Sequence, residues 1–273
     1  MRILVASETD TASLTIKDVL LNEFGFSDSG ESFEGNRVYM TDDARLITTK
    51  RDMIHCDHLE RHFKTEAFIF CSRHRADSGQ PSLLVHSTGN LGGEALFGGA
   101  PYELSVSAPS LVSVALRVLY EERNKRGLDE FDVSLEVTHH GPTSMKTPLV
   151  FVELGSSEDY WTHEEGGRAV AKAAIECVNE PLAGEAIIGF GGTHYASKFN
   201  KLVLEKGYMI GHIAPKYAID TLSPEVLQQM LKKSTNPITK AVIDWKGTNA
   251  ENKAHLFPML EDAQIEIVRA KNM

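Results

Sequence analysis

Short apolar runs alternate with segments of helical periodicity along most of the chain. In Ser13–Phe24 and Pro109–Arg126, apolar residues recur at intervals of three and four, which predicts amphipathic helices. Pro109 suits the start of the second helix, and Gly127 suits its end. The apolar runs between helices are short, from Arg2–Ala6 near the beginning to Ile265–Val268 near the end, and they predict strands.

The remaining elements follow the same alternation. The other predicted strands are Phe33–Met40 and Ala44–Thr48 (a hairpin), Ala67–Cys71, Ser82–His86, Val133–Val137, Leu149–Leu154, Glu185–Phe190, Tyr208–Ile213 and Ala241–Asp244. The other predicted helices are Asp57–Phe63, Asp159–Val178, Ala196–Glu205, Pro224–Lys232 and Asn249–Leu260. Nearly all-apolar strands separated by helices are typical of a mainly parallel or mixed sheet covered on both faces. We therefore predict an α/β protein with three α/β/α layers, formed as one domain over residues 1–273.

Composition places the chain among ordinary globular proteins, with 42% hydrophobic and 24% charged residues. No apolar run is long enough to cross a bilayer, so no membrane partner is expected. The first residues turn polar after Ala6, which favours an initial strand over a signal peptide and predicts a cytoplasmic protein. The three cysteines form no Cys-x-x-Cys pair, so neither a thiolate zinc site nor a disulfide framework is indicated.

The distribution of charge changes the expectation about partners. A net charge of −10 argues against a nucleic-acid ligand for the molecule as a whole. Residues 191–247, however, hold eight lysines and four acidic residues. A local basic face of that kind binds phosphates even on an acidic protein. The alternative is that these lysines are the solvated faces of ordinary helices.

Histidines carry the strongest chemical signal. Six of the eleven lie in short stretches of small residues near predicted strand ends: Cys71–His74, His86–Asn90, Val137–Thr143, Gly189–Tyr195 and Gly211–Tyr217. Histidine titrates near neutral pH and is the commonest metal ligand, while glycine lets the backbone approach a bound ligand. Ligand sites of α/β sheets form in the loops beyond the strands. We therefore expect these loops to converge on one reactive centre.

The adjacent pair His139-His140 and the carboxylate of Glu153 each need an explanation. Neighbouring residues of an extended chain point to opposite sides, so His139 and His140 can share a site only if the backbone turns, as Gly141-Pro142 would permit. A structural role for the pair remains the alternative. Glu153 lies near the end of an apolar strand, where an unpaired carboxylate is costly. Its partner could be a metal, a histidine or the N–H groups of the next helix.

The glycine-rich stretch before His194 resembles a phosphate cradle but lacks both the Gly-x-Gly-x-x-Gly and the Walker patterns. Its exposed amides, at Gly191 and Gly192, could bind an oxyanion. Asp244 ends an apolar strand and could bind a metal or orient a histidine, and Lys246 could meet a phosphate. No His-Glu-x-x-His motif occurs. From the residues alone, the chain reads as a hydrolase with metal assistance left open.

Taken in order, these segments resemble the archaeal and plant type of D-aminoacyl-tRNA deacylase. The His-His-Gly-Pro-Thr and Gly-His-Ile-x-Pro-Lys-Tyr strings are the most specific. The matching stretches are Phe24–Phe26, Ser72–His74, His86–Asn90, Thr138–Thr143, Glu153–Glu158, Gly191–Tyr195, Gly211–Ala218 and Asp244–Gly247. One departure is Gly-Gly-Thr-His194, where the family pattern leads us to expect Gly-Gly-Gly-His.

The resemblance implies hydrolysis of the ester between a D-amino acid and the terminal ribose of tRNA, with broad tolerance of the side chain. It also implies a zinc cofactor and an α/β/α fold similar to those of phosphorylases and peptidyl-tRNA hydrolases. The implied partner is the 3′ acceptor end of aminoacyl-tRNA, and no protein partner is implied. Another hydrolase on a similar scaffold, such as a peptidyl-tRNA hydrolase or a metal-dependent peptidase, and a non-catalytic tRNA-binding protein remain the alternatives.

Roles can be assigned on this basis as hypotheses. The candidate metal ligands are His86, His139, His140, Glu153, His194 and Asp244. The candidate catalytic residues are His140, Glu153 and His194, with Glu153 or a free histidine as general base and with Gly191 and Gly192 as the oxyanion site. The candidate residues for holding the tRNA end are Arg73, Lys216 and Lys246.

Overall fold

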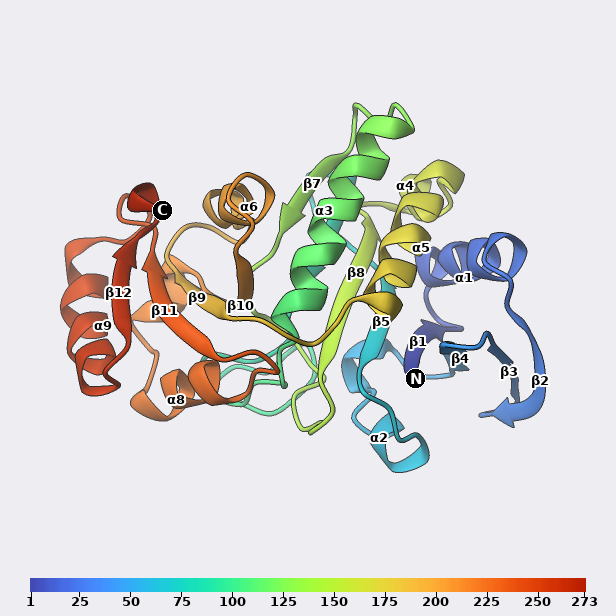
Figure 1. The fold of residues 1–273 in the computed structure, drawn as a ribbon, viewed down its shortest axis with the longest axis horizontal. Helices are drawn as coiled ribbons and strands as arrows, with labels where there is room; N and C mark the ends of the chain where they lie inside the picture. Colours follow the sequence, from blue (N-terminus) through green and yellow to red (C-terminus); the bar gives the residue numbers. More distant parts are fainter.

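Two β-sheets joined through a central helix form the frame of the protein (Figure 1). The computed structural model describes all of residues 1–273. The larger sheet has the order β2-β3-β4-β1-β5-β8-β6-β7, and the smaller one β10-β9-β11-β12. The strands are β1 (Arg2–Ser7), β2 (Ser27–Phe33), β3 (Asn36–Met40), β4 (Ala44–Thr49), β5 (Phe68–Arg73), β6 (Ser82–His86), β7 (Asp132–Leu135), β8 (Leu149–Gly155), β9 (Ala186–Phe190), β10 (Met209–Ala214), β11 (Ile238–Ile243) and β12 (Glu266–Arg269).

The helices connect these strands and lie on both sides of the sheets. They are α1 (Thr11–Glu23), α2 (Leu59–His62), α3 (Pro109–Lys125), α4 (Glu158–Trp161), α5 (Glu164–Asn179), α6 (Ser197–Leu204), α7 (Lys216–Ile219), α8 (Pro224–Lys232) and α9 (Ala250–Asp262), with 3-10 turns at Met53–His55 and Ala270–Asn272. No helix is both long and apolar enough to cross a bilayer.

Strand directions show that the larger sheet is mixed. β1 is parallel to β4 and β5, and β5 is parallel to β8, whereas β6 runs antiparallel to β8. The smaller sheet is parallel throughout. Apolar side chains of α1, α3 and α5 pack on one face of the larger sheet, and those of Met53, Cys56 and Leu59 pack on the other. The predicted α/β/α layering with a mixed sheet is therefore confirmed.

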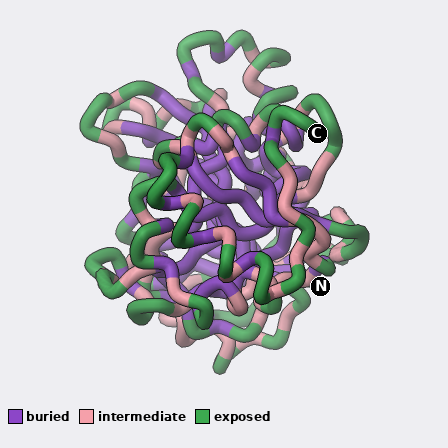
Figure 2. The backbone as a smooth tube through the Cα atoms, turned by 90° about the vertical axis from the view of Figure 1, so that its left-hand side faces the viewer, coloured by how far each residue is buried: buried purple, intermediate pink, exposed green.

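Helix α3 lies between the two sheets and packs against both β6 and β10 (Figure 1). One apolar cluster consequently includes Leu4 and Val152 of the larger sheet together with Ile187 and Val242 of the smaller one. Buried backbone runs through the middle of the molecule, with exposed loops around it (Figure 2). The assignment of residues 1–273 to a single domain stays a prediction.

The segment that follows β7 ties the sheets together. Val137 donates its N–H to His194 O at 3.1 Å, and Thr138 donates its N–H to Ile213 O at 2.9 Å. Glu136 forms an isolated β-bridge with Tyr195. We call these contacts the seam. They place the loops after β7, β9 and β10 next to one another.

Several elements differ from the sequence prediction: the short helix α7 was not predicted, and the strand predicted over Phe33–Met40 is interrupted between β2 and β3. The helix predicted over Asp159–Val178 is divided into α4 and α5, because the side chain of His163 accepts the N–H of Gly166 and starts a new helix. Strand β2 was not predicted, because its mostly exposed residues have no apolar pattern and it forms the edge of the sheet.

Candidate active site

Strand register places the polar side chains at the ends of β5, β6 and β8 on one face of the larger sheet. Ser72 is paired with Glu153 across β5 and β8, and His86 is paired with Phe151 across β6 and β8. Residues two apart on a strand point to the same side, so Phe151 and Glu153 share a face with their partners. His86 is the last residue of β6 and thus lies where the sheet opens into loops.

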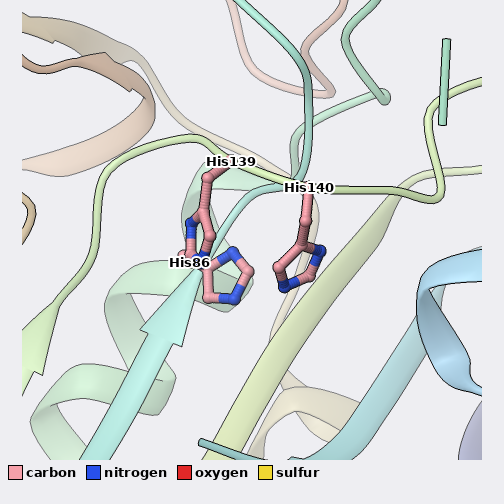
Figure 3. A group of neighbouring side chains, drawn as sticks. All are labelled: His86, His139 and His140. Carbon is pink, nitrogen blue, oxygen red and sulfur yellow. The ribbon is translucent and has the colours of Figure 1, made fainter. Parts of the chain in front are cut away.

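Three histidine rings converge beyond the end of β6 (Figure 3). The centroid of the His86 ring lies 4.2 Å from that of His139 and 4.8 Å from that of His140. The His139 and His140 centroids are 4.5 Å apart. His194, from the loop after β9, brings a fourth ring to 4.6 Å from His139. The structure therefore brings together all four histidines singled out as metal-ligand candidates.

The backbone turn that allows two adjacent histidines to share the site occurs at His140 itself. His140 has φ of +44°, in the left-handed region that non-glycine residues seldom adopt. The N–H of Gly89 contacts the carbonyl oxygens of both His139 and His140, at 3.2 and 2.8 Å. The turn expected at Gly141-Pro142 thus begins one residue earlier and is held by the loop after β6.

Backbone carbonyls fix the tautomers of the three clustered rings. The Nδ1 atoms of His86, His139 and His140 lie 3.2, 2.8 and 2.6 Å from the carbonyl oxygens of Ser87, Val137 and Gly141, respectively. A carbonyl oxygen only accepts hydrogen bonds, so each Nδ1 carries a proton. The lone pair of each neutral ring is consequently on Nε2. Metal-binding histidines are oriented by the same kind of bond.

Glu136 lies at the centre of the site, and sequence reasoning missed it. One of its oxygens is 3.0 Å from His194 Nε2 and 3.5 Å from His74 Nδ1, and the other is 4.0 Å from His86 Nε2. The side chain is fully buried, and none of these close contacts is aligned as a hydrogen bond. A buried carboxylate without hydrogen bonds is costly, which indicates a site made for a ligand or a reaction.

Glu153 is held more firmly than Glu136. Ser72 Oγ donates to its Oε1 at 2.7 Å, and His74 Nδ1 and His86 Nε2 lie 3.4 and 3.6 Å from its two oxygens. Burial alone would raise the pKa of Glu153, but contacts with His74 and His86 outweigh burial and hold the pKa well below its usual value. The partners of this buried acid are therefore histidines and a serine hydroxyl.

The buried imidazoles differ in the direction in which their pKa is shifted. Burial, together with the neighbouring His86, lowers the pKa of His140 to about 4 and that of His139 well below its usual value. For His74 and His86 burial also lowers the pKa, but contacts with Glu153 and the charge of Glu136 reverse the shift and raise it. Near neutral pH, the site thus combines two neutral rings with two rings that favour a positive charge.

A cleft with two arms opens onto the cluster. Both arms are lined by His139, His140, His194 and Phe97. The arm we call aromatic has a volume of about 490 Å³ and is otherwise lined by Gly89–Glu94, Leu96, Thr138, Pro215, Tyr217, Ala218 and Thr221. The arm we call charged has about 540 Å³ and is otherwise lined by Asp10, Asp52–Ile54, Ser72–Arg75, Asp77, Phe151 and Glu153. His139, His140 and His194 are therefore reached from two directions, whereas His86 and Glu136 line neither arm and lie beneath them.

The residues predicted to hold a tRNA end lie around the cleft, outside the histidine cluster. Arg73 lines the charged arm, where its guanidinium donates to Thr9 O at 3.0 Å and to Asp52 Oδ2 at 3.2 Å. Lys216 begins α7, next to the aromatic arm, and is exposed. Lys246 is exposed in the loop after β11.

Three predicted site residues have other roles. The N–H of Gly191 donates to Ala214 O and that of Gly192 to Gly247 O, both at 2.9 Å. These amides are engaged in the backbone network, so the structure does not support them as an oxyanion site. Asp244 belongs to none of the groups whose ligand atoms lie close together, and its carboxylate packs beside Gly247 instead. The fold therefore does not bring Asp244 to the histidines.

Gly191 supports the loop that carries His194. Its φ is +102°, and a Cβ there would lie 2.2 Å from Thr248 Oγ1. We expect Gly191→Ala to destabilise the protein by about 1–3 kcal/mol, through steric and backbone strain, and to reduce activity with it. Urea unfolding and an activity assay would measure both, with Gly207→Ala as control, since Gly207 has a similar φ of +72° but nothing within 4 Å. Equal stability of the two variants would contradict this account.

Ligand atoms for a metal ion are close together in three overlapping groups. They are His86, His139 and His140; Glu136, His139 and His194; and His74, Glu136 and Glu153, with atoms within 4.8 Å of one another in each group. The buried atoms His86 Nε2 and both oxygens of Glu136 have no hydrogen-bond partner, as expected of atoms that await a cation. Nitrogen and carboxylate ligands of this kind suit a divalent transition metal. The donor set therefore fits a metal ion.

Comparisons with known proteins show which family the chain resembles. A family model described as D-aminoacyl-tRNA deacylase matches residues 61–268. Curated proteins named D-aminoacyl-tRNA deacylase include one from Methanocaldococcus jannaschii, 37% identical over 97% of both chains, and one from Thermococcus kodakarensis, 35% identical over 98% of this chain and all of the other. A crystal structure of a conserved protein described as of unknown function is 32% identical and superposes with a TM-score of 0.91 over 100% of this chain and 96% of the other.

Proposed function

The chain belongs to the D-aminoacyl-tRNA deacylase family, and on that premise we propose how its cleft releases D-amino acids from mischarged tRNA. The reaction adds one water across the ester that joins the amino acid to the terminal ribose, and it gives free D-amino acid and free tRNA. The observation that carries the proposal is the convergence of four imidazoles and two buried carboxylates at the junction of an open cleft.

We assign the general base to Glu136. Hydrolysis needs a group that takes a proton from the attacking water while the water adds to the ester carbonyl. Glu136 lines neither arm of the cleft, so the proton of the water reaches it through His194, whose Nε2 lies 3.0 Å from a Glu136 oxygen. Glu153, considered for this role from the sequence, is occupied by Ser72 and contacted by two histidines. Its role is then to position His74 and His86.

His194 is placed to pass the proton to the leaving ribose oxygen. It is the most exposed of the clustered imidazoles, with 38% of its side chain accessible. The Tyr217 hydroxyl lies 3.2 Å from its Nδ1, and donation to Nδ1 leaves a proton on Nε2, which is 3.0 Å from Glu136. Glu136 and His194 can therefore exchange a proton at one edge and deliver it to the open side of the cleft.

We propose zinc as the metal that this donor set holds. His86, His139 and His140 would bind it through Nε2, and His86 would give up its proton to do so; three nitrogen ligands are the number that catalytic zinc sites use. When bound, zinc supplies a Lewis acid that lowers the pKa of water and polarises the ester carbonyl. The negative charge of Glu136 and Glu153 that favours a proton on His86 equally favours a cation there.

The acceptor end of tRNA is the part of the substrate that we place in the cleft. Lys216 beside the aromatic arm and Lys246 in the loop after β11 are the candidate contacts for it, whereas the guanidinium of Arg73 is already bound to Asp52 and Thr9 in the charged arm. Phosphate contacts from lysine and arginine weaken steeply with salt. Tolerance of many side chains fits a cleft whose reactive centre is reached from two open arms.

The direct test compares three substrates. We expect the purified protein to release D-tyrosine from D-tyrosyl-tRNA much faster than L-tyrosine from L-tyrosyl-tRNA, and to leave the amide of N-acetyl-tyrosine amide intact. Release is measured with radiolabelled amino acid. Preferential cleavage of the amide would favour a peptidase, and binding of both tRNAs without turnover would favour a non-catalytic tRNA-binding protein.

A further inference from the structure

We propose that the aromatic arm binds the terminal adenosine of tRNA, and that the charged arm receives the D-aminoacyl group with its α-ammonium. This inference rests on the deacylase function proposed above. It starts from the shape of the cleft, whose two arms meet at His139, His140 and His194. An ester held at those residues has a nucleoside on one side and an aminoacyl group on the other, so each arm must take one of them.

The charges of the two arms differ. The charged arm has four carboxylates, from Asp10, Asp52, Asp77 and Glu153, against two guanidinium groups, from Arg73 and Arg75, and the imidazole of His74. The aromatic arm has a single carboxylate, from Glu94, and no lysine or arginine. A surplus of carboxylates stabilises an ammonium group and repels a phosphate. The charged arm therefore suits the aminoacyl end, and the other arm suits an uncharged base.

Side chains of the aromatic arm are exposed in a way that suits a flat apolar ligand. Leu96, Phe97 and Tyr217 are 80%, 69% and 64% exposed, the three most exposed large hydrophobic residues of the chain. Exposed apolar surface gathered in one place marks a binding site. Purine bases stack on aromatic side chains, and this interaction tolerates any sequence. Adenosine at the end of every tRNA is a ligand of that kind.

The basic part of the chain lies next to the same arm. Pro215, Tyr217 and Ala218 line the aromatic arm, and the exposed Lys216 lies within the same turn of chain. Residues 191–247, with eight lysines and four acids, form much of the smaller sheet. Phosphates that precede the terminal adenosine would leave the arm past Lys216.

The test uses substrates with and without the base. We expect Tyr217→Leu to raise KM for D-tyrosyl-adenosine about tenfold, through the loss of stacking, and to leave KM for D-tyrosine ethyl ester unchanged. Tyr217→Phe is the matched control, because it keeps the ring and removes only the hydroxyl that contacts His194. It should change kcat and not KM. Asp77→Asn should raise KM for both substrates, since both carry the ammonium group.

Each outcome decides a separate question. An equal rise in KM for the adenosine ester and the ethyl ester in Tyr217→Leu would overturn the assignment of the arms, as would an effect of Asp77→Asn on neither ester. Failure of the wild-type protein to cleave D-tyrosyl-tRNA would overturn the proposed function itself. If the wild type cleaves D-tyrosyl-tRNA but Tyr217→Leu has an unchanged KM for D-tyrosyl-adenosine, the deacylase function stands and only the proposed adenosine site is wrong.

Discussion

Replacing Glu136 with Gln is expected to lower kcat for D-aminoacyl-tRNA by about 10²–10⁴-fold, the usual contribution of a general base. Gln has nearly the same shape, so the pocket keeps its volume. The amide cannot take a proton from water at neutral pH, and KM should change little because Glu136 is fully buried behind the histidines. Single-turnover deacylation measures the loss in the chemical step.

The Glu136→Gln variant should be at least as stable as the wild type, although it is far less active. The carboxylate of Glu136 is buried, and its 3.0 Å contact with His194 Nε2 is not aligned as a hydrogen bond, so replacing the charge by an amide relieves a desolvation cost. We expect the melting temperature of Glu136→Gln to equal or exceed that of the wild type, by calorimetry. Glu205→Gln, which removes one exposed carboxylate, controls for net charge. Full activity in Glu136→Gln would remove the residue from the mechanism, and loss of activity with loss of folding would leave it a structural role only.

Removal of bound metal is expected to abolish turnover, with a loss on the order of 10³-fold or more if the ion polarises the ester. His139→Ala should have the same effect, because His139 belongs to two of the three ligand groups. Zinc content per chain, measured by mass spectrometry beside activity, checks both predictions. Zinc should restore the chelated wild type and not the variant.

A matched histidine outside the cleft provides the control for metal binding. His255 donates its Nε2–H to Leu222 O at 2.8 Å and takes no part in the ligand groups. His255→Ala should therefore keep its zinc and its activity. A demonstrably metal-free wild-type protein with undiminished turnover would contradict the zinc proposal, and it would favour a mechanism in which Glu136 and His194 act alone.

The sequence predicted the fold well wherever hydrophobic periodicity was strong. The helix over Pro224–Lys232 has the bounds that were predicted, and the strands β1, β6 and β9 agree to within a residue. The exposed strand β2 has no apolar pattern, so it could not be predicted. Periodicity reports burial, and an element that buries little leaves little trace in the sequence.

For the site, the sequence indicated which side chains carry chemistry better than it indicated their connections. His86, His139, His140, His194 and Glu153 do converge. Glu136 was missed although it sits between the apolar Leu135 and Val137, the same signal that drew attention to Glu153. The amides of the glycine loop could not be judged, because hydrogen bonds between distant backbone segments leave no mark in a sequence.

The seam between the sheets determines at which point in folding the active site is complete. Its hydrogen bonds join the segment after β7 to loops some sixty and seventy-five residues further along, at His194 and Ile213. A nascent chain that has not yet delivered β9 and β10 therefore holds only part of the pocket. Contacts so distant in sequence form late, after local helices are in place. Activity should therefore appear when the two sheets become joined through the seam, and not before.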